Sequence, residues 1–299
     1  SSRFGPSARY VILPYSNSFR GPLRLHACAR TPVGGRQMLA RSCFRFGPSE
    51  TLARAVSRTV EALQPGDLLF VDEPRQTLSD LDNAIDCVGS HTIQWLEARG
   101  RVVAQRDIAI HVALVESGGH DAKVIDACRG IGVRRLALPF FLLQWSPQCR
   151  IYHGRLQGIG SGVRQTAVDF AQGKLGMSYC EKYSPPDSNA EAYYCSSLVD
   201  YAFRFALQKD LVFTQEPFTL IFEPHDFWED YYRKRQQVLP SCYGSNPTLL
   251  LHCPCVKYYE TALGAFAASR NTNLDQNWDQ HVTMEAYEAC IRQIADSSE

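Results

Sequence analysis

Apolar residues recur along this chain at two spacings, and each spacing predicts a type of secondary structure. Leu52, Val56, Val60 and Leu63 lie three or four residues apart, which predicts an amphipathic helix over 52–63 that ends before Pro65-Gly66. The same period predicts further helices at 78–98, 164–177, 191–209 and 279–296.

Short apolar runs between turn residues predict strands. They occur at 67–71, 108–115, 123–127, 133–138 and 218–222, with a shorter one at 10–14. Gly118-Gly119 separates the second run from the third and predicts a hairpin, because glycine readily adopts positive φ. Helices and antiparallel strands together predict an α+β domain.

Composition narrows the class of protein. The 299 residues are 45% apolar and 21% charged, which is typical of a soluble globular protein. Basic and acidic residues number 31 each, so the basic excess expected of a nucleic-acid partner is missing. The longest apolar stretch, 136–145, is shorter than the roughly 20 residues of a membrane span. We therefore predict neither a nucleic-acid partner nor an integral membrane segment.

The chain has eleven scattered cysteines, an odd count. A chain of this length needs no disulfides for stability, so we interpret it as a reduced, cytoplasmic protein. It begins with Ser-Ser, which leaves open whether a signal peptide has been removed.

Two residues suggest nucleophilic catalysis. Cys195 stands at the front of the predicted helix 191–209, where backbone amides favour a thiolate, and His111 lies in the strand 108–115. A thiol and an imidazole are the components of a cysteine hydrolase. If Ser188 or Asn189 caps the helix, Cys195 lies deeper and the amides help less. A buried inert thiol and a core histidine bonded to a carbonyl are the alternatives.

The hairpin supplies a third candidate. A turn centred on Gly118-Gly119 places His111 directly opposite Asp126. An aspartate there would hold one imidazole nitrogen and leave the other for a thiol. A slip of one residue would turn one of the two side chains to the other face of the sheet. Considered alone, Asp126 also fits a surface or turn acid.

Tyr179 precedes the loop that leads to Cys195. Its phenol is a candidate donor to the oxyanion of an acyl-transfer reaction, although a tyrosine packed on the helix fits equally well. The run His252-Cys253-Pro254-Cys255 places its thiols more closely than structural zinc ligands usually lie. The glycine-rich segment 158–162 lacks the lysine of a phosphate loop. We therefore predict no metal and no cofactor.

Several short motifs occur in an order that is similar to a known family. They lie at 65–70, 110–115, 124–127, 130–133, 175–179, 194–199 and 243–247. Over residues 60 to 250 the chain resembles the YiiX-like group of circularly permuted papain-like hydrolases, within the NlpC-type superfamily. The histidine precedes the cysteine, which fits the permutation. The chain has Cys180 where relatives often have Asp, and Ser197 where they often have Glu.

The resemblance implies a fold and a set of roles. A small antiparallel sheet carrying His111 and Asp126 would pack against the helix with the cysteine. Cys195 would be the nucleophile, His111 the base, Asp126 the orienting residue and Tyr179 an oxyanion donor. We expect an arginine-rich extension at 1–48, the hydrolase domain at 49–250 and a C-terminal extension at 251–299 packed on that domain.

The predicted activity is cleavage of an amide, peptide or thioester bond through a Cys-His-Asp triad and an acyl-enzyme. The predicted partner is a small-molecule or peptide-like acyl substrate. An acyltransferase at the same site and a non-catalytic papain-like binding scaffold remain alternatives. The sequence does not determine the oligomeric state.

Overall fold

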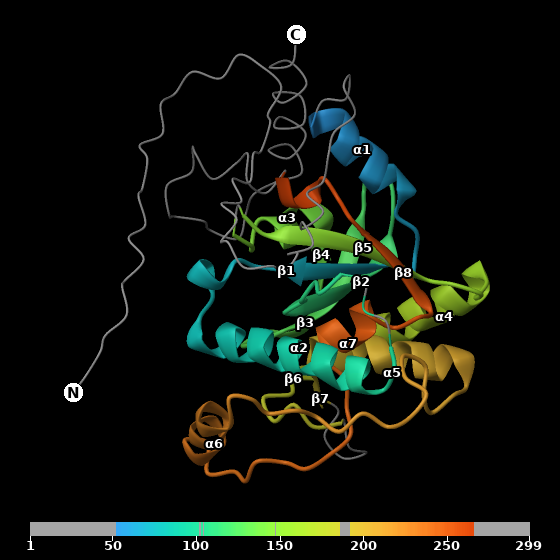
Figure 1. Ribbon diagram of the computed structural model, residues 1–299. Coiled ribbons are helices and arrows are strands. Elements are labelled where there is room, and N and C mark those ends of the chain that lie inside the picture. Colours follow the sequence, from blue (N-terminus) through green and yellow to red (C-terminus); the bar gives the residue numbers. More distant parts are fainter. Residues whose placement is uncertain (1–51, 102, 104, 147, 186–191, 266–299) are drawn as a thin grey trace, which may run out of the picture. The chain divides into compact units, whose positions relative to one another are not determined.

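The computed structural model describes residues 52–265, apart from 102, 104, 147 and 186–191 (Figure 1). The strand predicted at 10–14, the helix predicted at 279–296 and the extension at 1–48 lie outside the described residues.

The centre of the fold is a six-stranded antiparallel sheet in the order β4-β3-β2-β1-β5-β8 (Figure 1). The strands are β1 Leu68–Asp72, β2 His111–Ser117, β3 Lys123–Cys128, β4 Gly132–Ala137, β5 Arg150–Leu156 and β8 Val256–Glu260. A separate parallel pair joins β6 (Ser178–Tyr179) to β7 (Ala192–Tyr193). The α+β class is thus confirmed, with a larger sheet than predicted.

Helices lie on both faces of the sheet (Figure 1). The helices are α1 Leu52–Ala62, α2 Asp80–Ala98, α3 Leu138–Leu142, α4 Ser161–Gln172, α5 Cys195–Leu207, α6 His225–Arg233 and α7 Pro247–Leu251, with a short 3₁₀ turn at Arg75–Thr77. Among the described helices, none is both long and apolar enough to cross a membrane.

Alternate strand residues divide between two buried cores, as the two-residue period of a strand requires. On one face, Phe70 and Leu114 pack with Leu198 and Val199 of α5. On the other face, Val71, Ala113 and Val115 pack with α1 and α3. A third cluster joins α2 to the aromatic side chains of α6. The sheet therefore carries the cysteine helix on one face only.

Most predicted elements are present. The helices predicted at 52–63, 78–98, 164–177 and 191–209 appear as α1, α2, α4 and α5, and four predicted strands appear as β1 to β4. The strand predicted at 218–222 is wrong, because only an isolated bridge between Thr219 and Tyr243 forms there. Strand β8 lies beyond residue 250, the predicted end of the hydrolase domain, and it forms an edge of the sheet.

Candidate active site

Cys195 is the first residue of α5, and Tyr194 is its N-cap. The backbone N–H of Tyr194 donates to the Ser197 hydroxyl at 2.9 Å, and that hydroxyl donates to the Tyr194 carbonyl at 2.9 Å. The helix therefore starts at the cysteine and not several residues earlier. Because the first-turn amides of a helix lack partners within the helix, they favour a thiolate at Cys195.

His111 and Asp126 are in contact. The His111 Nε2 atom lies 2.9 Å from the Asp126 Oδ2 atom. The Asp126 side chain is fully buried and that of His111 is 12% exposed. This contact leaves Nδ1 of the imidazole available to a second group.

The predicted strand register was wrong, although the contact it implied exists. Leu114 lies opposite Ile125 and Val115 opposite Val124, a shift of two residues from the predicted pairing, with an irregularity between Val115 and Ser117. A shift of two keeps each side chain on its original face. His111 and Asp126 therefore meet diagonally.

Arg134 is a member of the site that the sequence analysis missed. It lies opposite Asp126 in the register of β3 and β4. Its Nε donates to Asp126 Oδ1 at 2.9 Å and its Nη2 to Oδ2 at 3.3 Å. Gly130 has a φ of 75° in the turn between these strands, so the opposed-pair argument used for the first hairpin would have found Arg134.

The pKa values of His111 and Asp126 depend on both burial and neighbouring charges. Burial alone lowers the pKa of His111, but the neighbouring Cys195 thiolate and the Asp126 carboxylate outweigh it and raise that pKa to about 10. Burial alone raises the pKa of Asp126, but His111 and Arg134 outweigh it and lower that pKa. The arrangement therefore favours an imidazolium beside Cys195, with the Asp126 carboxylate ionised.

Aromatic rings enclose the imidazole. The Trp145 and Phe141 rings lie 5.0 Å and 6.1 Å from the His111 ring, centroid to centroid. They restrict the orientation of the ring and shield it from solvent.

Tyr179 lies near the cysteine, as the sequence analysis requires of an oxyanion donor. It is in β6, which pairs with the β7 strand that leads to Tyr194. Burial raises the pKa of Tyr179, and the charge of Cys195 adds to this effect. The phenol is therefore neutral and able to donate.

The segment 243–247 packs against the start of α5. The N–H of Ser245 donates to the Tyr194 hydroxyl at 3.2 Å, and the Ser196 hydroxyl donates to the Ser245 carbonyl at 3.1 Å. A Cβ added at Gly244 would lie 2.7 Å from the Tyr194 oxygen, so a larger residue there would displace the Tyr194 side chain. This close approach fixes the position of the cysteine helix.

Cys195, His111 and Asp126 border one cavity of about 270 Å³. Tyr179, Tyr183 and Arg134 also line it. The structure thus brings together every residue that the sequence analysis proposed for the site.

Comparison with known proteins agrees with this arrangement. The profile of the YaeF/YiiX C92 family, described as a permuted papain-like amidase enzyme, matches residues 62–254. The chain belongs to this family. It is therefore an enzyme of the papain-like amidase and peptidase class, and the fold predicted from the motif order is confirmed.

A similar solved structure is that of the metalloprotein YiiX from Escherichia coli O157:H7. It is 15% identical, covers 66% of this chain and 97% of its own, and gives a TM-score of 0.48. No curated protein matches the sequence significantly.

The two departures from the pattern of the C92 family have structural roles. Ser197 occupies the third position of α5 and caps the helix start, which is the role of Glu in a capping box. Cys180 is buried, and its thiol lies 3.5 Å from the Ser184 carbonyl. Neither displaces Cys195, His111 or Asp126.

One group of residues in the described part of the chain has the spacing of metal ligands. The ligand atoms of His225, Asp226 and Glu229 lie within 4.8 Å of one another on α6, and all three residues are exposed. Exposed groups of this kind commonly bind no ion. In the run 252–255, which the sequence analysis considered as a zinc motif, the Cys255 thiol lies 3.7 Å from the Val212 carbonyl.

Proposed function

We propose that this protein is a thiol-dependent amidase in which Cys195 is the nucleophile, His111 the general acid and base, and Asp126 the residue that orients His111. The observation that carries this proposal is the position of His111. One ring nitrogen is bound to a buried carboxylate, and its pKa responds to a thiol at a helix N-terminus.

The geometry supports a two-step reaction. The Cys195 thiolate attacks the carbonyl carbon of an amide, peptide or thioester bond, and the carbonyl oxygen becomes an oxyanion. In this proposal the first-turn amides of α5 and the Tyr179 hydroxyl donate hydrogen bonds to that oxygen. The oxyanion collapses, His111 protonates the departing group, and a thioester to Cys195 remains.

Water completes the cycle. His111, now neutral, takes a proton from a water molecule, which attacks the thioester carbonyl. The acid leaves, and the proton on His111 restores the imidazolium beside the thiolate. Burial raises the pKa of Asp126, but His111 and Arg134 outweigh burial and lower it. Asp126 therefore stays ionised throughout the reaction.

Alkylation by iodoacetamide at pH 7 tests the proposal. Cys180 is a matched internal control, since it is 8% exposed against 7% for Cys195. We expect Cys195 to react far faster than Cys180, and His111→Ala to remove about 10²-fold or more of that advantage. Peptide mapping by mass spectrometry gives both rates in one sample, and circular dichroism checks that the variant is folded.

The opposite result identifies a different class of protein. If Cys195 reacts no faster than Cys180, the thiol is not activated, the proposed role of Cys195 is wrong, and the binding-scaffold alternative is favoured. Hydrolysis and acyl transfer differ in the fate of the acyl group on Cys195. If water alone removes the acyl group, the reaction is hydrolysis and not transfer to another acceptor.

A further inference from the structure

The cavity beside Cys195 has a largely apolar wall. Leu81, Ile85 and Val88 of α2 line one part of it, and Leu220, Ile221 and Phe222 line another. Its volume of about 270 Å³ lies just below the roughly 300–1,000 Å³ of pockets for drug-sized ligands. It suits a compact group such as an aromatic ring, and an extended peptide would have to reach beyond it.

The two arginines that line the cavity already have acidic partners. Arg134 is paired with Asp126, and Arg129 lies 3.5 Å from Glu181. Burying an anionic substrate group here would cost free energy, because neither guanidinium is free to pair with it. The cavity therefore disfavours an anionic group.

Within this apolar surface, the Tyr183 hydroxyl is a buried donor without a partner. Tyr183 is 9% exposed, and its oxygen has no hydrogen-bond partner among the described residues. Burial raises the pKa of Tyr183, so the hydroxyl keeps its proton. The Tyr179 hydroxyl lies near the Tyr183 oxygen and opposes this rise in pKa as a donor would, but the Tyr183 O–H itself has no acceptor among the described residues.

Other tyrosines of the same aromatic cluster differ in this respect. The Tyr194 hydroxyl accepts from the Ser245 N–H, Tyr231 donates to Glu181, and Tyr232 donates to the Lys182 carbonyl at 2.6 Å. Buried polar groups in folded proteins nearly always have partners. An unpaired phenol in a substrate-sized cavity therefore points to a partner on the ligand.

The backbone at Tyr183 supports the same conclusion. Its φ of 48° lies in the left-handed region, which costs an L-residue about 1–2 kcal/mol. Its ring is held by neighbours, since the Tyr194 and Trp228 centroids lie 5.6 Å and 5.5 Å away. Strained residues of this kind cluster at functional sites.

The Tyr183 hydroxyl is not alone. The Ser245 hydroxyl and the Trp145 N–H also line the cavity and are buried without a hydrogen-bond partner among the described residues. Ser245 borders a second cavity as well, and Trp145 packs on His111. Tyr183 is the donor set among the aromatic side chains of the apolar wall.

Given the proposed function, we infer that the substrate carries, beside its scissile bond, a compact apolar group that fills this cavity and bears an oxygen acceptor for the Tyr183 hydroxyl. Tyr183 is then a specificity-determining residue, separate from the groups that act on the scissile carbonyl.

Chloroacetamides of graded structure test the class of substrate, because the Cys195 thiolate displaces chloride and records binding as an alkylation rate. We expect the N-benzyl probe to label Cys195 about tenfold or more faster than the N-carboxymethyl probe, as burial of an aromatic ring is favourable. Equal rates, or a faster carboxymethyl probe, would overturn the apolar assignment.

Tyr183→Phe tests the acceptor. Among the 2-, 3- and 4-acetylbenzyl chloroacetamides, we expect at least one to react about 2- to 10-fold faster than the benzyl probe, the effect of one hydrogen bond. That advantage should vanish in Tyr183→Phe and persist in the control Tyr231→Phe, whose hydroxyl has a protein partner.

The outcomes are distinct. An acetyl advantage that survives Tyr183→Phe, or is missing from all three isomers, would overturn the role of Tyr183. So would an equal slowing of every probe, iodoacetamide included, since Tyr183 would then act on the thiol itself. If iodoacetamide shows that wild-type Cys195 is inert, the proposed function fails instead.

Discussion

Two groups of the same composition, a histidine, an aspartate and an arginine, lie on the central sheet. In the candidate site, His111 Nε2 lies 2.9 Å from Asp126 Oδ2 and Arg134 Nε 2.9 Å from Asp126 Oδ1. In the second group, His153 Nε2 lies 2.8 Å from Asp67 Oδ2, and Arg155 Nε lies 2.6 Å from Asp67 Oδ1.

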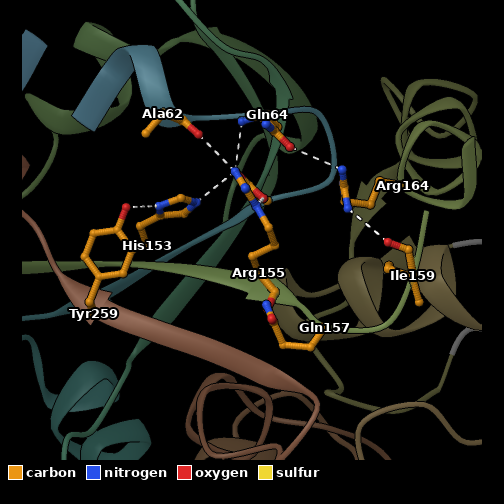
Figure 2. A network of polar contacts seen from close by, with 9 residues as sticks. Ala62, Gln64, His153, Arg155, Gln157, Ile159, Arg164 and Tyr259 are labelled. Atoms are coloured by element: carbon orange, nitrogen blue, oxygen red, sulfur yellow. Dashed lines mark hydrogen bonds and ion pairs between the residues drawn. The ribbon is translucent and has the colours of Figure 1, made fainter. Parts of the chain in front are cut away.

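The second nitrogen of each histidine distinguishes the groups. His153 Nδ1 is bonded to the Tyr259 hydroxyl at 2.6 Å, and Arg155 also donates to the Ala62 carbonyl (Figure 2). Both nitrogens of the His153 ring are therefore occupied. Through Arg155 and Ala62, this group connects the end of α1 to β5. The free nitrogen of His111 lies instead beside a thiol and a cavity.

This difference teaches that a buried His-Asp-Arg group is not by itself a sign of catalysis. It becomes one where the imidazole keeps a nitrogen for a nucleophile and a substrate can reach it. The comparison predicts that the first group controls reactivity and the second controls stability.

The largest expected effect separates the two histidines in turnover. We expect His111→Gln to lower hydrolysis of a chromogenic thioester by about 10²- to 10⁴-fold, because the general acid and base is lost. His153→Gln should leave the rate unchanged at temperatures where it is folded. A large loss in the folded His153 variant would show that the second group also takes part in the reaction.

The pH dependence of Cys195 alkylation should differ by about 100-fold at pH 6.5 between wild type and His111→Gln. In wild type, the pKa of His111 is raised to about 10, so the imidazolium is present below that pH and supports the thiolate. The rate should stay nearly constant from pH 6.5 to 9. In the variant it should rise through the ordinary thiol range near 8.5. A wild-type rate that also rises there would contradict the ion pair.

Asp67→Asn should cost about 3 kcal/mol in the free energy of unfolding, because it breaks a buried ion pair and leaves Arg155 without its carboxylate. Urea unfolding at pH 7 measures this loss, while Cys195 alkylation should not change. Asp126→Asn is the matched variant, and it should slow alkylation as well as destabilise.

The sign of the pH effect sharpens this test. Burial raises the pKa of Asp67, but Arg155 and His153 outweigh burial and lower it, so its ionisation stabilises the folded state above the unfolded pKa near 3.9. The difference between wild type and Asp67→Asn should therefore shrink as the pH falls below about 4. A difference that is independent of pH would mean that shape and not charge is lost.

The elements that the sequence predicted correctly have a local signal. Helices α1 and α2 show the apolar period, and β3 is bounded by turn residues. Strands β5 and β8 pair with each other across about 100 residues, and β5 contains polar residues and Gly154, so neither has a local pattern. The apolar run at 218–222 looked like a strand but lies where only one bridge can form.

The three residues proposed for catalysis could be selected from the sequence for a different reason. Cys195, His111 and Asp126 lie in short motifs whose order matches the family, and the face of a strand survives a register shift of two. Tyr183 escaped prediction because its two distinguishing features, a positive φ and a hydroxyl without a partner, exist only in three dimensions.

The smallest expected effects concern two tyrosine hydroxyls, of which only one has a partner within the protein. Tyr259→Phe removes the partner of His153 Nδ1 and should cost about 1 kcal/mol, a fall in Tm of about 2–4 °C for a domain of this size. Tyr183→Phe removes a buried hydroxyl that has no partner, so Tm should stay the same or rise. Thermal unfolding followed by circular dichroism compares the two single-atom changes directly.

If Tyr183→Phe lowers Tm as much as Tyr259→Phe, the Tyr183 hydroxyl is bonded within the protein, and its role in binding a substrate loses its basis. If only Tyr259→Phe destabilises, the second group is the structural one and the unpaired donor belongs to the cavity beside Cys195.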